Sequence, residues 1–521
     1  MSRKRSLFRI LLVIAFLLVN AGILAVLIKE GGWYIYEGHL EQQRIVAQTS
    51  SASAPDPIKQ TIDFSAPVAS GSPLVFGGAH YPPLNHGDAW NKIAAVGVTS
   101  IRVDIAIQYA FPRGTTLEKY RADTGGIRDP KNWDRAFIEE RKAIFKAARA
   151  RGMKVIAIMN YAPAWLTYTG TEYGVPRDWE IYRDIVGKMY AEYRDLIDYI
   201  EIWNEPNMPG DKLFLVPTGS GLTRIQAYER IFKEASDAIR AVDKTANDGI
   251  RAKIGAQVSY TSQESDFLIP LLENPETAKH IDFVSYHHYE PYPSRSDTAT
   301  RKILERFSRT DIPVLQTEWS YSSKGKEVDL VIPENAGIPY AGAMLVNFLN
   351  MGLYAANYHT VTAYLPQKPF GLERSHAFYH WDGSAHLFPM AKTWRLMSKT
   401  LGLGKGPSVI FRNDSREDIP VLGFKNVDGR EGVVLVNAQQ EEKFVEVVFD
   451  ALPAGVEWRR ASVYIASAED NGASELLRSI LHRRGNAMSL KLYLPKESVT
   501  GVLLADDVSL PEQLRYHILN R

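Results

Sequence analysis

The sequence contains no cysteine and has no excess of charge of either sign. The missing cysteine excludes disulfide bonds, thiol nucleophiles and Cys-ligated zinc or iron–sulfur centres. Lys and Arg number 61 against 60 Asp and Glu, so the 521-residue chain carries a net charge of +1. A protein that binds nucleic acid through its phosphates needs a clustered basic excess, so nucleic acid is not an expected partner.

Motifs of several enzyme classes are also missing. There is no His-Glu-x-x-His pair and no Asp-rich calcium loop, so we expect no metal site and no cofactor. The Gly-x-Ser-x-Gly elbow of serine esterases does not occur. No glycine-rich phosphate loop follows the first expected strand, and the glycine-rich residues 402–406 follow a helical pattern, which is typical of a linker.

The N-terminal region contains a long apolar run, Ile10–Ile28, in which Asn20 is the only clearly polar residue. At 1.5 Å per residue the run measures about 28 Å, close to the thickness of the hydrocarbon core of a bilayer. Basic residues precede it and no good cleavage site follows, so residues 1–30 are predicted to be a cytoplasmic tip and a single transmembrane anchor. The Ser/Ala/Pro-rich residues 31–73 are predicted to be a flexible tether. The sequence therefore predicts a single-pass protein of the cytoplasmic (inner) membrane, folded on the periplasmic side.

Between residues 74 and 405, short β-rich runs alternate with segments of helical spacing. Eight such units in this length predict a (β/α)8 barrel, and a doubly wound sheet is the alternative. The expected strands are Leu74–Gly78, Thr99–Asp104, Lys154–Met159, Tyr199–Asn204, Lys253–Ser259, Ile281–His287, Pro313–Glu318 and Tyr354–Val361.

The pattern changes after residue 405. Residues 406–508 contain short strands separated by turns such as Asp428-Gly429, which predicts an all-β, sandwich-like module. A helical insert is expected near Leu476–Leu481, and residues 509–521 form a C-terminal tail. We expect this module to pack against the barrel as a support, because none of its residues forms a catalytic pattern.

Two glutamates stand at the ends of expected strands. Glu205 follows the fourth strand, and Glu318 ends the seventh. The active site of such a barrel lies at the C-terminal ends of its strands, so the two carboxylates should face each other across its mouth. Glycoside hydrolysis needs such a pair, one group to protonate the leaving oxygen and one to meet the anomeric carbon.

Other strand ends offer partners for these carboxylates. A nucleophilic carboxylate must stay ionised, and Arg102 at the end of the second strand is placed to hold it. Tyr289 can donate a hydrogen bond to the nucleophile, and His287 can contact the acid or the sugar. Glu201 has the strand parity of the barrel interior and is interpreted as the partner of an interior cation.

These motifs resemble a known family. The Trp-Asn-Glu-Pro-Asn run of Trp203–Asn207 and the Thr-Glu-Trp of Thr317–Trp319 look like the (β/α)8 clan of retaining glycoside hydrolases. The resemblance is greatest to family 39, including its bacterial exopolysaccharide-processing members. It implies that Glu205 is the acid/base, that Glu318 is the nucleophile and that Asn204 binds the sugar 2-hydroxyl. Arg102, His287 and Tyr289 match supporting positions. The eighth strand departs from the clan, because Tyr358, His359 and Tyr364 stand where a tryptophan is usual.

Aromatic residues make up 11% of the chain and include 26 Tyr and 10 Trp. Trp165 and Trp319 lie near strand ends and are predicted to stack on sugars, since aromatic rings present large apolar faces. The expected partner is a polysaccharide or oligosaccharide, together with exopolysaccharide-synthesis machinery at the envelope. A transglycosylase that uses the same residues and a non-catalytic polysaccharide-binding scaffold are the alternatives.

Overall fold

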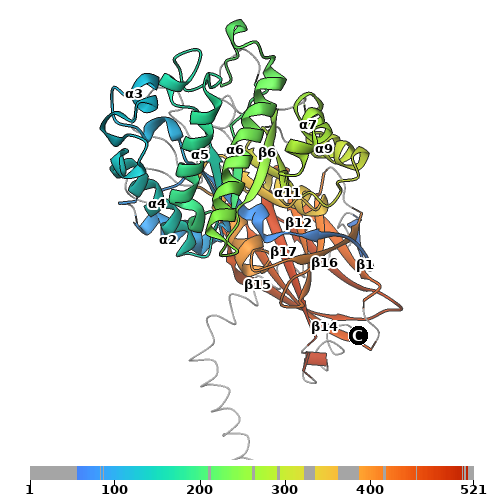
Figure 1. The fold of residues 1–521 in the computed structure, drawn as a ribbon. Helices are drawn as coiled ribbons and strands as arrows, with labels where there is room; N and C mark the ends of the chain where they lie inside the picture. Colours follow the sequence, from blue (N-terminus) through green and yellow to red (C-terminus); the bar gives the residue numbers. More distant parts are fainter. Residues whose placement is uncertain are drawn as a thin grey trace, which may run out of the picture.

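The computed structural model (Figure 1) describes the chain from residue 56 to residue 513. The exceptions are residues 83, 86, 209–212, 261–263, 290–293, 322–334, 362–386, 415–417, 453–454, 507 and 510–511. The predicted anchor, the first part of the predicted tether, Tyr364 and most of the predicted C-terminal tail lie outside the described residues.

The predicted membrane localisation is corrected by the structure. In the ranges given above, no helix is both long enough and apolar enough to cross a membrane. The apolar run at residues 10–28, on which the prediction rested, is not among the described residues.

Eight parallel strands close into a barrel, as the strand–helix alternation predicts. The first and last strands pair through Gly77 with Asn357 and Gly78 with Tyr358, and this closure excludes the doubly wound alternative. The strands are β2 (Gly77–Ala79), β3 (Ser100–Asp104), β4 (Lys154–Met159), β5 (Tyr199–Ile202), β6 (Lys253–Tyr260), β7 (Phe283–His288), β8 (Val314–Trp319) and β9 (Ala355–Tyr358).

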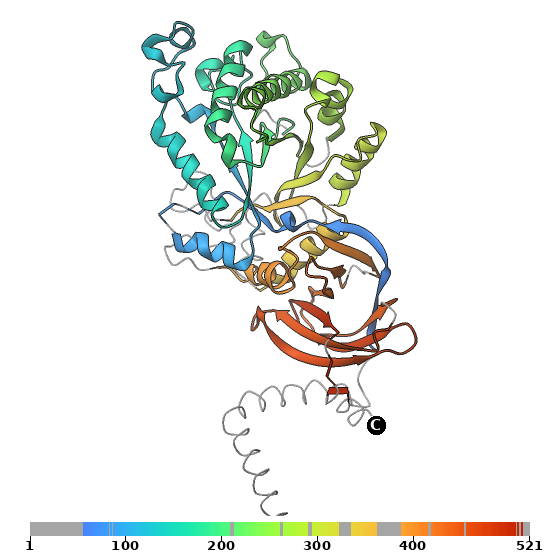
Figure 2. The same ribbon diagram turned by 60° about the horizontal axis from the view of Figure 1, so that its bottom comes forward.

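Helices surround this barrel (Figures 1 and 2). The α5 helix begins where the Asp178 side chain accepts a hydrogen bond from the backbone of Ile181, and α6 begins with a capping box between Thr223 and Gln226. The described helices are α2 (Gly87–Val96), α3 (Leu117–Arg121), α4 (Arg135–Arg149), α5 (Trp179–Tyr193), α6 (Arg224–Ala246), α7 (Glu264–Glu273), α8 (Pro275–Ala278), α9 (Ser294–Arg306), α11 (Gly337–Asn350) and α12 (Ala391–Trp394), which continues as a π-helix (Arg395–Thr400).

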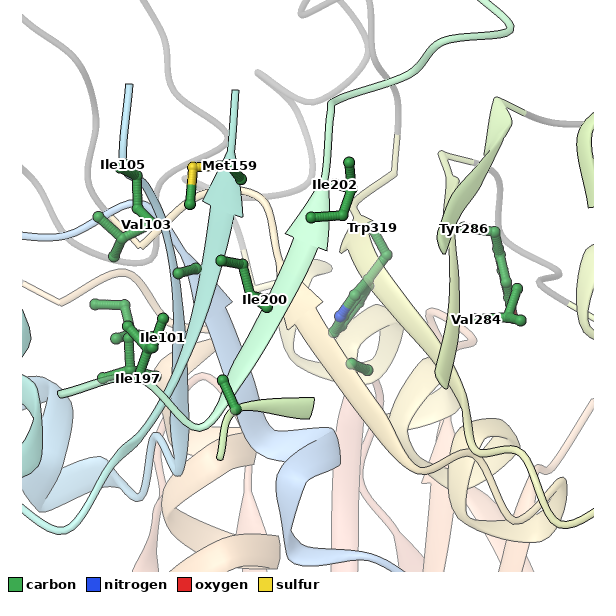
Figure 3. Close-up of a cluster of buried hydrophobic side chains, with 14 of the residues drawn as sticks. Ile101, Val103, Ile105, Met159, Ile197, Ile200, Ile202, Val284, Tyr286 and Trp319 are labelled. Atoms are coloured by element: carbon green, nitrogen blue, oxygen red, sulfur yellow. The ribbon is translucent and has the colours of Figure 1, made fainter. Parts of the chain in front are cut away.

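Side chains alternate between the two faces of the barrel wall, because successive strand residues point in opposite directions. Ile101 and Val103 of β3, with Ile200 and Ile202 of β5, belong to the buried apolar cluster between strands and helices (Figure 3). A separate apolar cluster fills one end of the barrel interior. It contains Leu74, Ile156, Tyr199, Phe283, Leu315 and Ala355.

The C-terminal module is β-rich, as predicted. Its nine strands form one sheet in the order β15-β14-β17-β12-β11-β10-β1-β13-β16. Buried side chains such as Val433, Val447 and Leu490 form a core of its own. The strands are β1 (Ile58–Gly71), β10 (Ser408–Asn413), β11 (Val421–Lys425), β12 (Glu431–Asn437), β13 (Lys443–Asp450), β14 (Trp458–Ala466), β15 (Asn471–His482), β16 (Met488–Leu494) and β17 (Ser498–Ala505).

Two local predictions about this region are wrong. Residues 58–71, expected in the tether, form β1, which pairs with β10 on one side and β13 on the other. Figure 2 shows this blue strand running alongside the orange and red strands of the module. The expected helix at 476–481 is part of β15, an edge strand that pairs antiparallel with β14. Its apolar residues are spaced as in a helix, but strand pairing decided the structure.

The module is packed directly on the barrel. A Cβ atom added at Gly342 of α11 would lie 2.4 Å from Val499 of β17, so only a glycine permits this close approach. The Lys392 ammonium of α12 donates to the carbonyl oxygens of Ser467 and Ala468 at 2.7 and 2.8 Å. Helices α11 and α12 of the barrel therefore pack against the module and not against solvent.

Candidate active site

The predicted polar residues gather at one end of the barrel. Arg102 is on β3, Glu205 follows β5, His287 is on β7 and Glu318 is on β8. Because all eight strands are parallel, their C-terminal ends lie at the same rim. The hydrogen bonds described below connect these residues directly, together with Asn204 and Tyr289.

The chain leaves β5 through an unusual backbone conformation. Trp203 and Glu205 have positive φ angles of 69° and 47°. The Trp203 indole is wholly buried, donates to the Leu213 carbonyl oxygen at 3.1 Å, and packs edge-on against Tyr161. Non-glycine residues with positive φ cost of order 1–3 kcal/mol, so this packing holds a conformation that the chain would otherwise avoid.

A β-bulge sets the direction of Glu318. In the pairing of β7 with β8, Tyr286 is opposite Gln316 but His287 is opposite Glu318, so Thr317 is an extra residue. Bulges change which face a side chain points to. Here the Thr317 hydroxyl and the Glu318 carboxylate both bind groups of the barrel interior, Glu201 and Arg102.

The two carboxylates lie close together across the barrel mouth. His287 Nδ1 is 2.7 Å from Glu205 Oε1 and 3.4 Å from Glu318 Oε2. One oxygen of each glutamate and a nitrogen of His287 all lie within 4.8 Å of one another. His287 is fully buried, and Glu205 is 5% exposed. One imidazole nitrogen therefore sits between both carboxylates.

Arg102 connects the barrel interior to this pair. Its Nε donates to Glu201 at 2.5 Å, Nη1 donates to Glu318 at 2.6 Å, and Nη2 donates to Asn204 Oδ1 at 3.0 Å. Glu201 is fully buried and also accepts from Thr317 at 2.7 Å, so its predicted role as the partner of an interior cation is confirmed. Burial alone would lower the pKa of Arg102, but the charges of Glu201 and Glu318 raise it above its usual range.

Glu318 is held in its ionised form. Burial acts to raise the pKa of its carboxyl, but the neighbouring His287 and His359 rings, the Arg102 guanidinium and the hydrogen bond from Tyr289 lower it well below its usual range. The Tyr289 hydroxyl donates to Oε2, and Arg102 donates to Oε1. Both oxygens of this carboxylate are thus bound by donors, which favours the charged form.

A pair of histidines completes this side of the site, and the sequence analysis gave neither a role. His80 follows β2 and His359 follows β9, and their Nε2 atoms lie 3.2 Å apart. The His359 ring is edge-on to Tyr289 at 5.9 Å between centroids. Their positions at strand ends were the only available signal, since their contact depends on closure of the barrel between its first and last strands.

The two tryptophans predicted to bind sugar have other surroundings. Trp319 is wholly buried and points into the apolar core, where its ring stacks on Trp394 with centroids 5.8 Å apart (Figure 3). That prediction is wrong, because the bulge at Thr317 turns Glu318 inward and Trp319 outward. Trp165 is half-buried and stacks on Tyr120 at 5.4 Å, within an aromatic cluster that also includes Phe111.

Glu205, His287 and Glu318 are close enough together to be considered as a metal site. However, both Glu318 oxygens already accept hydrogen bonds, from Tyr289 and from Arg102, and Arg102 Nη1 lies 2.6 Å from Glu318 Oε1. A cation there would meet a fixed positive charge. The arrangement therefore suits an ionised Glu318 beside the carboxyl group of Glu205 better than it suits a bound metal ion.

Comparison with solved structures shows the same fold in several glycosidases. A glucosidase from Croceicoccus marinus has a TM-score of 0.61 and 15% identity, with 87% of this chain and 100% of that chain covered. A GH30 endoxylanase from Clostridium papyrosolvens C71 has a TM-score of 0.58 and 13% identity, with coverage of 85% and 99%. The GH39 enzyme from Xanthomonas axonopodis pv. citri has a TM-score of 0.57 and 13% identity, with coverage of 87% and 99%. Identities this low establish the fold alone.

Family models give a more definite result. No curated protein matches this sequence. The model described as Cellulase (glycosyl hydrolase family 5) matches residues 65–355, which is more than half of the chain. The expected membership of family 39 is not confirmed, although an enzyme of that family shares the fold. The protein is thus a glycosidase of the (β/α)8 type, and the chain belongs to the cellulase family, glycosyl hydrolase family 5.

Proposed function

We propose that this protein is a retaining glycoside hydrolase that cleaves O-glycosidic bonds of a polysaccharide or oligosaccharide by double displacement. The observation that carries the proposal is the distance between Glu205 and Glu318, whose facing oxygens lie within 4.8 Å. Retaining enzymes hold their carboxyl groups about 5–5.5 Å apart, whereas inverting enzymes separate them by about 6.5–9.5 Å to admit a water molecule.

In the first step, a Glu318 carboxylate oxygen attacks the anomeric carbon. The bond from that carbon to the leaving oxygen breaks, and Glu205 gives its proton to this oxygen. The surroundings of Glu318 favour the assignment, because Arg102 and Tyr289 keep it ionised and therefore nucleophilic. His287 holds Oε1 of Glu205 at 2.7 Å, and the other oxygen of the carboxyl group carries the proton.

In the second step, Glu205 accepts a proton from water, and the resulting hydroxide oxygen attacks the anomeric carbon. The bond between that carbon and Glu318 breaks, and the sugar is released with its original configuration. Glu318 again becomes a carboxylate held by Arg102 and Tyr289. Asn204 is proposed to hold the sugar 2-hydroxyl, since its Oδ1 is fixed by Arg102 at 3.0 Å beside both glutamates.

The substrate class follows from the family and the similar structures. The matching model is that of cellulases, and the neighbours include a glucosidase and an endoxylanase. Glucans and xylans are therefore the first substrates to test. The expected link to exopolysaccharide synthesis depended on the membrane prediction and on the resemblance to family 39, and it is not part of this proposal.

The decisive test is to trap the intermediate. The wild-type protein is incubated with 2,4-dinitrophenyl 2-deoxy-2-fluoro-β-glucoside and the corresponding xyloside, and labelled peptides are identified by mass spectrometry. We expect a glycosyl adduct on Glu318 and none in the Glu318→Gln variant. Proton NMR of early products should show the β-anomer first. Full activity of Glu318→Gln on cello- or xylo-oligosaccharides, or inverted products, would refute the proposal, while longer oligosaccharide products would indicate the transglycosylase.

A further inference from the structure

Two half-buried histidines stand beside the proposed nucleophile, and the double-displacement steps give them no role. His80 follows β2 and His359 follows β9. Their Nε2 atoms lie 3.2 Å apart, and the two rings meet edge-on with centroids 5.0 Å apart. His359 stands at the end of the eighth barrel strand, where the clan usually has a tryptophan. The resemblance to that clan therefore does not account for the pair.

The backbone fixes both rings at the seam where the barrel closes. The His80 N–H donates to the Arg102 carbonyl oxygen at 2.9 Å, and the His359 N–H donates to the Trp319 carbonyl oxygen at 2.9 Å. His80 has a positive φ of 61°. For a residue other than glycine this conformation costs of order 1–3 kcal/mol, and such strain is concentrated at functional sites. The strain at His80 therefore points to a role for its side chain.

A single hydrogen lies between the two Nε2 atoms. Each imidazole nitrogen either donates or accepts, so this contact needs one donor and one acceptor, and two N–H groups would repel each other. Burial lowers the pKa of the His80 ring, and the carboxylates of Asp104 and Glu318 act in the opposite direction. The guanidinium groups of Arg102 and Arg141 favour the neutral ring, as burial does. The pair thus carries at most one positive charge.

The pair reaches the nucleophile through Tyr289. The His359 ring is edge-on to the Tyr289 ring with centroids 5.9 Å apart, and the Tyr289 hydroxyl donates to Glu318 Oε2. Because this hydroxyl is at the far end of the ring, a small rotation of the ring moves it away from the carboxylate. Burial raises the pKa of the Glu318 carboxyl, and His359 is among the neighbours that lower it. His359 therefore acts on the nucleophile both through the donor it contacts and electrostatically.

We propose that His80 and His359 form a positioning dyad, in which the hydrogen between their Nε2 atoms locks the His359 ring and this ring holds Tyr289 on Glu318. The inference rests on the proposed function and adds two residues to the support of its nucleophile. The dyad acts through Tyr289 and exchanges no proton with the sugar. A displacement of about 1 Å in an active site can cost about 100-fold in rate, so we expect the loss of this indirect support to cost about tenfold.

The attack by Glu318 is measured on its own, by saturation kinetics of labelling. Wild-type protein, His80→Asn, His359→Phe and the double variant are treated with the 2,4-dinitrophenyl 2-deoxy-2-fluoro-β-glucoside or β-xyloside, whichever labels wild type faster. Asn tolerates the positive φ of His80 but is too short to replace Nε2, and Phe keeps a ring against Tyr289 without the nitrogen.

Each single substitution should lower the limiting rate constant for labelling by about tenfold and leave the dissociation constant of the probe unchanged, because the dyad positions the nucleophile and not the sugar. The double variant should also lose about tenfold, since both substitutions remove the same contact. In Tyr289→Phe protein, His359→Phe should add less than about twofold, because the hydroxyl that the dyad positions is already missing.

His280→Phe is the matched control. His280 is 7% exposed, and its Nε2 is 2.9 Å from Asp237 Oδ1. It lies three residues before β7 begins, whereas His287 lies near the other end of that strand. The substitution should lower the melting temperature, because it breaks a buried polar contact, and should leave the labelling constants unchanged.

A spectroscopic measurement separates this inference from the proposed mechanism. In protein labelled with ¹⁵N-histidine, the Nε2 signals of His80 and His359 should each change when the other residue is replaced, also in the Glu318→Gln background, as one shared hydrogen requires. Losses that multiply in the double variant, wild-type labelling rates in the single variants, an equal loss in His280→Phe, or independent Nε2 signals would overturn the inference. Full activity of Glu318→Gln would instead refute the mechanism alone.

Discussion

The buried contact between Arg102 and Glu201 provides a stringent test of how the site is held. Glu201 is fully buried in the barrel interior and accepts a hydrogen bond from Arg102 Nε at 2.5 Å. Arg102 in turn binds Glu318 and Asn204. The substitution Glu201→Gln keeps the shape of the side chain but removes the charge opposite the guanidinium. It should therefore affect both the stability of the barrel and the catalytic rate.

The size of the stability effect follows from burial. Removing one partner of a buried ion pair costs about 3–5 kcal/mol. Arg102 retains Glu318, so we expect the lower end, about 3 kcal/mol, or a melting temperature lower by about 4 °C for a barrel of this size. The activity effect follows from position. A shift of a catalytic group by 1 Å can cost about 100-fold, so kcat/KM should fall by about 10- to 100-fold.

The assay needs a control variant that is destabilised to the same extent by a change far from the active site. Glu431 binds Arg459 in the module, and their side chains are only 7% and 5% exposed. Glu431→Gln should lower the melting temperature by a similar amount and leave kcat/KM unchanged at temperatures below unfolding. If Glu201→Gln keeps wild-type kcat/KM, Arg102 does not position Glu318 through Glu201, and the reasoning fails. If both variants lose activity in parallel, the loss reflects unfolding.

Three further changes to the chain have expected outcomes. In Tyr289→Phe, Glu318 loses a donor that lowers its pKa, so the acid limb of the kcat/KM profile should move to higher pH by about one unit; a limb that stays in place would contradict this. The pKa of Glu318 is lower in the folded protein than in the unfolded chain, so this carboxylate stabilises the fold above the ordinary glutamate pKa. That stabilisation is lost as the pH falls through the folded-state pKa. Because Tyr289→Phe raises the folded-state pKa, this variant should unfold at a higher pH on acidification. Trp319→Ala should cost about 3–5 kcal/mol in urea unfolding, whereas a sugar-stacking residue would change KM with stability intact. Removing residues 56–71 should expose the inner edges of β10 and β13 and abolish cooperative unfolding of the module, which a dispensable tether would leave intact.

The barrel could be predicted from the sequence because its signals are local. Each strand is a short apolar run, and helices such as α5 show the spacing and the Asp178 cap that define them. Every strand of the barrel overlaps a predicted one, although β2 is reduced to Gly77–Ala79. The positions of Glu205 and Glu318 at strand ends follow from the same local pattern.

The errors arose where pairing between distant segments decides the structure. Residues 58–71 contain Pro67, which argues against a central strand, yet the register of β1 with β10 shifts on both sides of this proline. The irregularity removes the need for its missing N–H group. A strand that pairs with segments some 340 to 390 residues later leaves no mark on its own composition beyond the alternation of Ile62 and Phe64, which face the module core.

The bulge in β8 is a second case of this kind. Counting by two from Leu315, which lies inside the barrel, places Thr317 and Trp319 inward and Glu318 outward. Because Thr317 is an extra residue in the pairing with β7, Glu318 instead points inward and Trp319 points outward. Only the pairing partner reveals this, so the motif was correctly positioned along the chain while the tryptophan was assigned to the wrong face.

The tryptophans of the two motifs therefore have a role in the fold that explains their position beside the glutamates. Trp203 precedes Glu205 by two residues and is wholly buried against the loop residues Tyr161 and Phe214. Trp319 directly follows Glu318 and is wholly buried against Phe348 and Trp394 of the surrounding helices. The positive φ angles after β5 and the bulge in β8 each depart from regular strand geometry and cost stability. Burying a tryptophan next to each irregularity offsets that cost with the largest apolar side chain available. Each carboxylate is thus held at the rim by a backbone that its neighbouring indole anchors in the core.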